Sequence, residues 1–264
     1  MINIESLKVR YGSNGPALSV DRLRIERGQC VAIIGPTGAG KSTLLRSIKG
    51  YVRPAQGKVE VMGVNPWMAN RREKRQIRRH IGLVYQQFHL LPRLSVLQNV
   101  LCGRLGLTHR WRSLLGWFSS EDIRIAWSAI CEVGLEEQVH QRGDTLSGGE
   151  QQRVAVARVV AQEASIILAD EPVSSLDPVW ATKVLQLIGT VQSHHDTTLV
   201  MSLHQPERAQ RFAQRIIGLR QGRIVFDGPP AALTEATMEE IYCGDDNINL
   251  NPSPSFRATQ AAIA

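Results

Sequence analysis

A glycine-rich octapeptide near the N-terminus of this chain has the composition of an anion-binding loop. Residues 35–42 read Gly-Pro-Thr-Gly-Ala-Gly-Lys-Ser, which fits the pattern GxxxxGK[ST]. Glycines allow successive backbone N–H groups to turn toward one anion, and a following helix adds the positive end of its dipole. Lys41 could then reach the β- and γ-phosphates, and the Ser42 hydroxyl could hold Mg²⁺. The octapeptide therefore predicts a site for the phosphates of a nucleotide.

Two adjacent carboxylates close a second apolar segment. Residues 166–169 are Ile-Ile-Leu-Ala, and Asp170 and Glu171 follow them directly. Ligands of α/β folds sit at the carboxyl ends of parallel strands, so these acids would meet the phosphate loop if the two strands are neighbours. Asp170 would then hold Mg²⁺ through water, and Glu171 would polarise the attacking water. The alternative is an ordinary acidic turn, which is less favoured because the phosphate loop is present.

A second pair of glycines marks another possible anion site. Residues 146–153 read Leu-Ser-Gly-Gly-Glu-Gln-Gln-Arg, and Ser147 stands near the start of a helix expected over 150–162. Two such helix starts with a single phosphate loop suggest that the two sites share a ligand. Each site would be half complete, so two copies of the chain would pair head to tail.

Short strands and helices alternate along the chain around these residues. Three apolar runs, at 30–34, 166–169 and 197–202, are typical of strands buried on both faces. The other expected strands are 2–10, 18–25, 59–62, 81–85 and a hairpin of 216–220 with 223–227, and the expected helices are 41–49, 150–162 and 178–191. This alternation predicts an α/β protein. Residues 95–145 lack β-branched runs, so we expect a mostly helical, separate lobe there.

Composition limits the classes of protein that fit. The chain has 264 residues, 43% of them apolar, which is enough for a sizeable core. Its formal net charge of +7 suits an anionic partner, whether a nucleotide, a nucleic acid or a membrane surface. No segment is long and apolar enough to cross a bilayer, and the alternating residues 1–10 predict no signal peptide. The four cysteines are far apart, so we expect neither a disulfide framework nor a zinc site.

Three further groups of residues have less specific interpretations. A basic run from Arg71 to Arg79 could contact an anionic surface or could be the solvated face of a helix, and the second interpretation is favoured. His194, His195 and Asp196 lack the spaced ligands of a metal site and fit a solvated turn better. The five tryptophans are scattered, which is typical of packing or interface residues rather than of a base-stacking platform.

Taken together, the three motifs resemble those of the ATP-binding cassette (ABC) family. LSGGEQQR is similar to the ABC signature, GPTGAGKST at 35–43 to its Walker A, and IILADE at 166–171 to its Walker B. The resemblance runs from about residue 1 to 243 with the motifs in the family's order. It implies an α/β P-loop NTPase fold with a RecA-like core sheet, an N-terminal antiparallel β-subdomain and a helical subdomain at about 95–160. The ATP-binding domain would span 1–244, and 245–264 would be a disordered tail.

The resemblance also implies the residues that bind ATP and Mg²⁺. The ATP-binding residues would be Tyr11, Gly35, Pro36, Thr37, Gly38, Ala39, Gly40, Lys41, Ser42, Thr43, Ser147, Gly148, Gly149 and Asp177. Tyr11 would stack on adenine, and Asp177 would lie across a homodimer together with the signature. Mg²⁺ would be held by Ser42, Gln86 and Asp170. The catalytic residues would be Glu171, His204, Lys41 and Gln86. His204 would contact the γ-phosphate, and Gln86 would also sense membrane subunits.

Several features resemble the importer branch of the family. The chain carries one cassette, and Gln86 to Leu146 spans only 60 residues, too few for the coiled coil of ABC-type DNA-repair ATPases. Residues 101–118, which include Arg104 and Trp111, are similar to the ATP-binding subunit of phosphonate importers. The resemblance implies transmembrane permease subunits, a periplasmic or extracellular substrate-binding protein, and a peripheral place on the cytoplasmic face of the cell (inner) membrane.

The sequence leaves several substrates and roles open. Importers of phosphite or hypophosphite fit the same pattern, as does an ABC-type accessory protein of a carbon–phosphorus lyase complex. A nucleic-acid-handling ABC ATPase is a more distant alternative suggested by the basic charge, although no nucleic-acid partner is expected. Residues 101–118 should face the membrane subunits, so they could carry partner identity.

Overall fold

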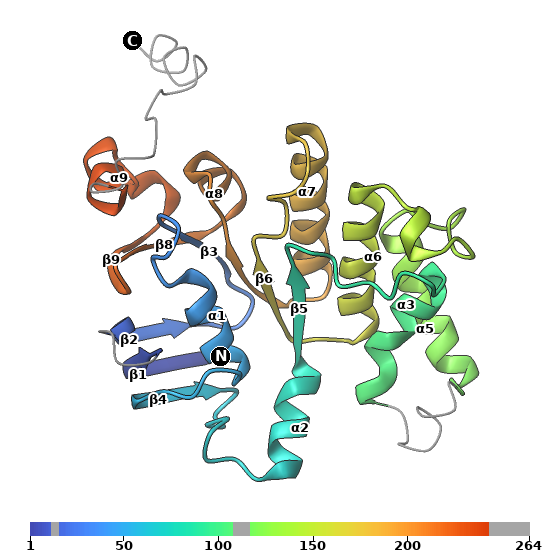
Figure 1. Cartoon of the computed structure of the whole chain (residues 1–264), viewed down its shortest axis with the longest axis horizontal. Helices are drawn as coiled ribbons and strands as arrows, with labels where there is room; N and C mark the ends of the chain where they lie inside the picture. Colours follow the sequence, from blue (N-terminus) through green and yellow to red (C-terminus); the bar gives the residue numbers. More distant parts are fainter. Residues whose placement is uncertain (12–15, 108–116, 243–264) are drawn as a thin grey trace.

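The chain folds around two β-sheets of different kinds (Figure 1). This computed structural model describes residues 1–11, 16–107 and 117–242. The smaller sheet is antiparallel, with strand order β2-β1-β4. Its strands are β1 (Ile2–Arg10), β2 (Pro16–Ile25) and β4 (Gln56–Val61). Ile4 pairs with Leu23 on one side and with Val59 on the other, so the alternating apolar residues of all three strands share one buried face.

β4 begins earlier than the hydrophobic pattern predicts. The expected strand started at Val59, whereas the ladder already includes Gln56 and Lys58, which pair with Lys8 and Glu5 of β1. These first residues are exposed and polar, so hydropathy gives no sign of the backbone pairing that extends the strand.

The larger sheet carries the three apolar strands that the sequence predicts. Its order is β5-β6-β7-β3-β8-β9, and the strands from β5 to β8 pair in parallel while β9 returns antiparallel to β8. The strands are β3 (Cys30–Ile34), β5 (Ile81–Tyr85), β6 (Ile166–Asp170), β7 (Thr198–Ser202), β8 (Arg215–Arg220) and β9 (Arg223–Gly228). Every residue of β3 and β7 is buried, as expected of strands covered on both faces.

Helices connect and cover these strands, and local signals set many of their ends. The α-helices are α1 (Lys41–Lys49), α2 (Arg71–His80), α3 (Val96–Leu101), α5 (Ser120–Glu132), α6 (Gly148–Ala161), α7 (Pro178–His194), α8 (Pro206–Phe212) and α9 (Glu235–Tyr242). Short 3₁₀ segments lie at η1 (Cys102–Gly106), η2 (Gly143–Thr145) and η3 (Pro230–Ala232). α1 ends where Gly50 adopts a left-handed conformation with φ 77°. α6 begins two residues before the expected start, because Ser147 caps it.

A helical lobe and the small sheet lie on opposite sides of the core sheet in Figure 1. α3, α5 and α6 pack on one another, and α6 also contacts β5 and α7. The buried apolar residues form two clusters, one joining the lobe to the core sheet and the other joining the small sheet to α1. Among the described residues, no helix is long and apolar enough to span a membrane. The predicted tail at 245–264 and Trp111 fall outside these residues.

Candidate nucleotide site

The phosphate loop joins β3 to α1 and depends on glycines for its shape. Gly35 has a φ of 144°, and a Cβ built there would lie 2.1 Å from the carbonyl oxygen of Leu219. Gly40 has a φ of 103° and abuts the backbone of Ala17. L-residues with side chains rarely adopt such angles, so glycine is required on both conformational and steric grounds.

The turn between β8 and β9 supports the loop from behind. The N–H of Gly222 donates to the carbonyl of Ala39 at 3.0 Å, and the N–H of Ser19 donates to the carbonyl of Gly222 at 2.6 Å. The phosphate loop is therefore held by β2 and by a hairpin that lies far away in the sequence. The sequence predicts this hairpin but gives no sign that it contacts the loop.

Lys41 is buried within the phosphate loop. Lys41 is 5% exposed, and its Nζ donates to the carbonyl oxygens of Gly35 at 2.7 Å and Pro36 at 3.0 Å. Burial lowers the pKa of the Lys41 ammonium from its usual value, and the charges of Glu171 and Asp170 offset part of that effect. The ammonium thus lies among backbone oxygens and carboxylates, close to where the phosphates of a nucleotide would place their charge.

Asp170 receives two serine hydroxyls on one oxygen. Ser42 Oγ donates to Asp170 Oδ1 at 2.9 Å, and Ser202 Oγ donates to the same oxygen at 2.8 Å. The expectation that the strands of the phosphate loop and of Asp170 are neighbours is wrong, because β7 lies between β3 and β6. Ser202 ends that intervening strand and pairs in register with Asp170. A polar residue closing an apolar strand is the one sequence signal that could have identified it.

Glu171 and His204 meet at the same edge of the sheet. His204 Nε2 lies 2.6 Å from Glu171 Oε1, and the two side chains are 41% and 18% exposed. The N–H of Glu171 donates to Ser202 Oγ at 2.9 Å. Glu171 has a φ of 51°, an uncommon conformation for a residue with a side chain. The turn after β6 therefore holds this carboxylate in a fixed direction toward the loop that follows β7.

Gln86 and Asp177 lie on loops at this edge and contact other residues there. Gln86 follows Tyr85, which pairs with Asp170 across β5 and β6. The carbonyl of Gln86 accepts a hydrogen bond from Ser175 Oγ at 3.4 Å, which joins its loop to the segment after Glu171. Asp177 caps α7 by accepting from the N–H groups of Val179 and Trp180. Their assigned roles in binding Mg²⁺ and in contacting a second copy remain predictions.

The signature segment starts α6. Ser147 caps this helix, and its Oγ lies 2.7 Å from Glu150 Oε2 in a capping box. Gly148 faces the side chain of Leu176, and Gly149 lies against the ring of Trp180, which a Cβ would approach to 3.0 Å. In Figure 1, β5 and β6 lie between α6 and α1 in this view, so the two predicted anion sites of one chain belong to different parts of the molecule.

The sequence of the chain was compared with models of known families. A family model described as ABC transporter matches residues 18–174. The chain belongs to the ABC transporter family. Its match covers the phosphate loop, the signature and the Asp170–Glu171 pair, so this chain carries the ATP-binding domain of that family.

Named relatives cover nearly the whole ABC chain. A protein of Halalkalibacterium halodurans named Phosphonates import ATP-binding protein PhnC 2 is 46% identical over 242 residues, which is 92% of this chain and 99% of that protein. A Synechococcus protein of the same name is 40% identical over 264 residues, which is 100% of this chain and 98% of that protein.

Solved ABC structures confirm the fold. The dimeric ATP-binding cassette MJ0796, bound to ADP and Pi in a post-hydrolysis state, is 33% identical with a TM-score of 0.74 over 87% of this chain and 99% of its own. Clostridium perfringens cbiO1 is 24% identical with a TM-score of 0.80 over 100% of this chain and 98% of its own, and it supports the fold alone. The predicted combination of core sheet, antiparallel β-subdomain and helical subdomain is confirmed.

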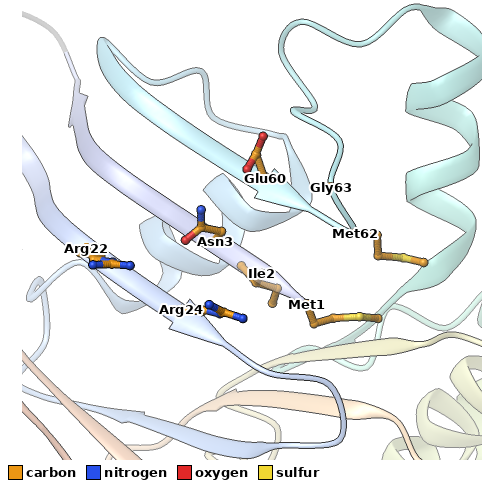
Figure 2. Close-up of a pocket in the computed structure, with 8 residues that line it drawn as sticks. All are labelled: Met1, Ile2, Asn3, Arg22, Arg24, Glu60, Met62 and Gly63. Carbon is orange, nitrogen blue, oxygen red and sulfur yellow. The ribbon is translucent and has the colours of Figure 1, made fainter.

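Two other features of the ABC chain lie outside the group of side chains around Asp170 and Glu171. Tyr11 directly follows β1 and is 50% exposed, and its proposed contact with adenine remains a prediction. A separate hollow lies on the small sheet, as Figure 2 shows, and it is lined by Met1, Ile2, Asn3, Arg22, Arg24, Glu60, Met62 and Gly63. These residues lie in β1, β2 and β4 or directly beside β1 and β4, not in the phosphate loop, so this hollow is distinct from the nucleotide site.

Arg104 lies inside the helical lobe. It belongs to the segment 101–118, whose contact with membrane subunits remains a prediction, and its own side chain is only 9% exposed. Its guanidinium donates to Asp122 at 2.9 Å, to the carbonyl of Ala161 at 2.9 Å and to Glu163 at 2.6 Å. Arg104 therefore holds the helical lobe together, and it has little surface with which to contact a partner.

Proposed function

We propose that this chain is the ATP-hydrolysing subunit of a binding-protein-dependent ABC importer, with phosphonates as the imported substrate. The observation that carries the ATPase proposal is the group of side chains gathered at one sheet edge: Lys41, Ser42, Asp170, Glu171, Ser202 and His204. The substrate assignment is supported by relatives named for phosphonate import, which are 46% and 40% identical over nearly the full chain.

The site fits a nucleotide with Mg²⁺. Ser42 Oγ and Asp170 Oδ1 are hard oxygen donors 2.9 Å apart, which is the chemistry that Mg²⁺ prefers, and the Gln86 amide would add a third oxygen. Among the described residues, no group of three His, Cys, Asp or Glu side chains could hold a metal ion by itself, and phosphate oxygens and water would complete the coordination. When bound, Mg²⁺ neutralises charge on the β- and γ-phosphates.

The protein's own groups divide the work of hydrolysis. The backbone N–H groups of residues 35–43 would bind the phosphates, and Lys41 would exchange its carbonyl partners for phosphate oxygens. Glu171 would accept a hydrogen bond from the attacking water and polarise it. His204 Nε2 lies 2.6 Å from Glu171 Oε1. When ATP is bound, His204 would turn toward the γ-phosphate, so its contact with Glu171 would depend on whether that phosphate is present.

A homodimer would complete each site. Ser147, Gly148 and Gly149 start a different helix from the phosphate loop, and a second copy could present them and Asp177 to the nucleotide. The 33% identical cassette is a dimer bound to ADP and Pi, which supports the same arrangement here. Binding of ATP would shift the population of dimers toward a closed state, and hydrolysis would reopen the dimer.

The dimer would act on membrane partners. We place it peripherally on the cytoplasmic face of the inner membrane, against transmembrane permease subunits that receive substrate from a binding protein. The ATP-binding domain would span 1–244, and its helical subdomain, about 95–160, would contact the permease. Trp117 and Trp127 of this subdomain are 67% and 44% exposed. Tryptophan is enriched at protein–protein interfaces, so these residues suit a contact with the permease.

Uptake of labelled methylphosphonate tests the proposal directly. Cells that depend on this chain would be compared with cells carrying Glu171→Gln, with phosphate and phosphite as competitors. We expect the substitution to abolish uptake and unlabelled phosphonate to compete best. The matched control is His195→Ala, because His195 is partly exposed and contacts Glu132 away from the nucleotide site.

Each other outcome points to a different function. Stronger competition by phosphite would assign the importer to that anion. Intact uptake with failed growth on phosphonate would place the protein after entry, as an accessory of a carbon–phosphorus lyase. Retained uptake and retained ATPase activity in Glu171→Gln would contradict the assigned role of Glu171.

A further inference from the structure

Helix α2 concentrates the positive charge of the chain. Its ten residues hold six cations and one carboxylate, a net charge of +5, whereas the whole chain has a net charge of +7. We call the cations of this helix the α2 cationic face, and they are Arg71, Arg72, Lys74, Arg75, Arg78 and Arg79. Only Ile77 of the helix is buried, and four of the six cations, Arg71, Arg72, Arg75 and Arg78, are exposed to a partner.

The cationic face lacks partners among the described residues. None of its six cations forms an ion pair within the described part of the chain. Three like-charged pairs stand four residues apart, Arg71–Arg75, Lys74–Arg78 and Arg75–Arg79, and each such pair destabilises the helix. An anion bound between them would relieve this repulsion, which a merely solvated face would leave in place.

The surface beside α2 is hollowed and partly apolar. One hollow is lined by five of these cations together with Gly106, and no carboxylate is among its lining residues. A second hollow adds Leu107, which is 37% exposed, and Glu163, whose carboxylate is held by Arg104 at 2.6 Å. Cations grouped with an exposed leucine fit the boundary of a membrane, where phosphates lie above acyl chains.

The position of α2 separates it from the nucleotide site. Figure 1 shows α2 at the amino end of β5, whereas the nucleotide residues follow the carboxyl ends of β3, β6 and β7. A phosphate held by α2 is therefore a different ligand from ATP. A nucleic acid is less favoured, because no Phe, Tyr or Trp is among the residues that line the two hollows.

We propose that the α2 cationic face binds the phosphate headgroups of anionic phospholipids at the membrane surface. The inference rests on the peripheral place given to the protein under the proposed function, but not on its substrate. Lipid contact here would add to the contact with permease subunits and would fix the orientation of the cassette on the membrane. Each cation would contribute separately, since headgroups are many and mobile.

Vesicle binding of the purified full-length chain tests this contact without any permease. The probes are vesicles of phosphatidylcholine alone and of phosphatidylcholine mixed with phosphatidylglycerol, with binding read by co-sedimentation. We expect binding to the mixed vesicles only, weakened by added salt. The triple variant Arg71→Gln/Arg75→Gln/Arg78→Gln should lower the partition coefficient by about 100-fold. Glutamine keeps helix propensity, and circular dichroism would check that α2 and the fold persist.

A matched control removes the same charge elsewhere. Arg22, Arg53 and Arg223 are exposed, and none forms an ion pair with another described residue. The triple variant with glutamine at these positions should bind mixed vesicles within about two-fold of the wild type. An equal loss in both triple variants would reduce the effect to net charge and would overturn the proposal, as would equal binding to both kinds of vesicle.

Competitors identify the source of the phosphate. Glycerol phosphate should displace the protein from vesicles no better than sodium chloride of the same ionic strength. Stronger displacement would overturn the lipid surface in favour of a site for a free phosphate compound. Tighter binding to duplex DNA than to mixed vesicles would overturn it in favour of a nucleic acid. Because ATPase activity and uptake are measured separately, failure here leaves the proposed function intact.

Discussion

His204 Nε2 lies 2.6 Å from Glu171 Oε1, so the residues that follow the neighbouring strands β7 and β6 are directly joined. The hydroxyl of Ser202 links the same two strands by accepting from the Glu171 N–H and donating to Asp170. One polar network therefore connects the predicted Mg²⁺ carboxylate, the predicted base and the predicted γ-phosphate sensor. Its members should depend on one another in both stability and activity.

Glu171→Gln should stop turnover while leaving ATP bound. The amide keeps the shape of the carboxylate but is a far weaker acceptor for the proton of the attacking water, so ATPase activity should fall by about 100-fold or more. Phosphate release measures the turnover, and equilibrium binding of ATP measures the affinity. His195→Ala is the control and should leave both unchanged. Turnover near the wild-type rate in Glu171→Gln would show that another group polarises the water.

Ser202→Ala should lower both stability and activity, although no sequence motif includes this residue. The substitution removes a donor from Asp170 and an acceptor from the Glu171 N–H in a fully buried position. The free energy of unfolding should fall by about 1–3 kcal/mol, and ATPase activity should fall with it. Urea unfolding and phosphate release give the two values. Ser47→Ala is the control, because Ser47 is equally buried but donates only to Thr43 in α1. Its ATPase activity should be unchanged, and unchanged activity in Ser202→Ala as well would contradict the network.

Gly35→Ala should destabilise the fold far more than a comparable change at Gly63. Both glycines have positive φ angles, 144° and 78°, but only at Gly35 would a Cβ overlap a backbone atom, the Leu219 oxygen at 2.1 Å. Gly63→Ala should cost about 1 kcal/mol for its conformation alone, whereas Gly35→Ala should cost more than about 3 kcal/mol. Urea unfolding compares the two variants. Equal losses would show that β8 moves away from the phosphate loop without penalty.

The free energy of unfolding of the wild-type protein should rise with pH at alkaline pH, and the substitution Lys49→Met should remove that rise. Burial, with the nearby charge of Arg78, lowers the pKa of Lys49 to about 8 from 10.5. Between these values the unfolded chain binds more protons than the folded chain, so the free energy of unfolding of the wild type should increase with pH. Below about pH 8 the buried charge costs about 3 kcal/mol, which the methionine variant lacks.

The difference between the two proteins is the measurement. The variant should be more stable near neutral pH, and its advantage should shrink as the pH rises toward about 10. The carbonyl of Ile81, which accepts from Lys49, also accepts from Gln162 at 3.2 Å, so it keeps a partner in the variant. Urea unfolding at several pH values tests this, and an advantage that stays constant with pH would contradict it.

Arg104→Met should destabilise the helical lobe. The substitution leaves the carboxylate of Asp122, which is 10% exposed, without its guanidinium partner, and it frees the carbonyl of Ala161. Loss of one member of a buried ion pair costs about 3–5 kcal/mol. Glu163→Gln is the control, because the Glu163 side chain is 60% exposed and its contact should contribute about 1 kcal/mol or less. Thermal unfolding compares them, and similar losses would show that the Asp122 pair is not the stabilising one.

The parts of this protein whose chemistry lies in one continuous segment were predictable from the amino-acid sequence. The phosphate loop, the acids after β6 and the serine cap of α6 are local patterns, because glycine conformations and helix ends depend on neighbouring residues. The run of apolar residues likewise predicted β3 and β7 as strands buried on both faces. The resemblance to the ABC family was readable from these motifs for the same reason.

Which distant segments meet follows from the folded chain. The insertion of β7 between β3 and β6 placed Ser202 in contact with both Asp170 and Glu171, and the turn at Gly222 came to support the phosphate loop. The same is true of Arg104, which the sequence associated with partners and the fold buries. Such pairings depend on the burial and hydrogen-bonding of the whole chain at once, so no local pattern of residues encodes them.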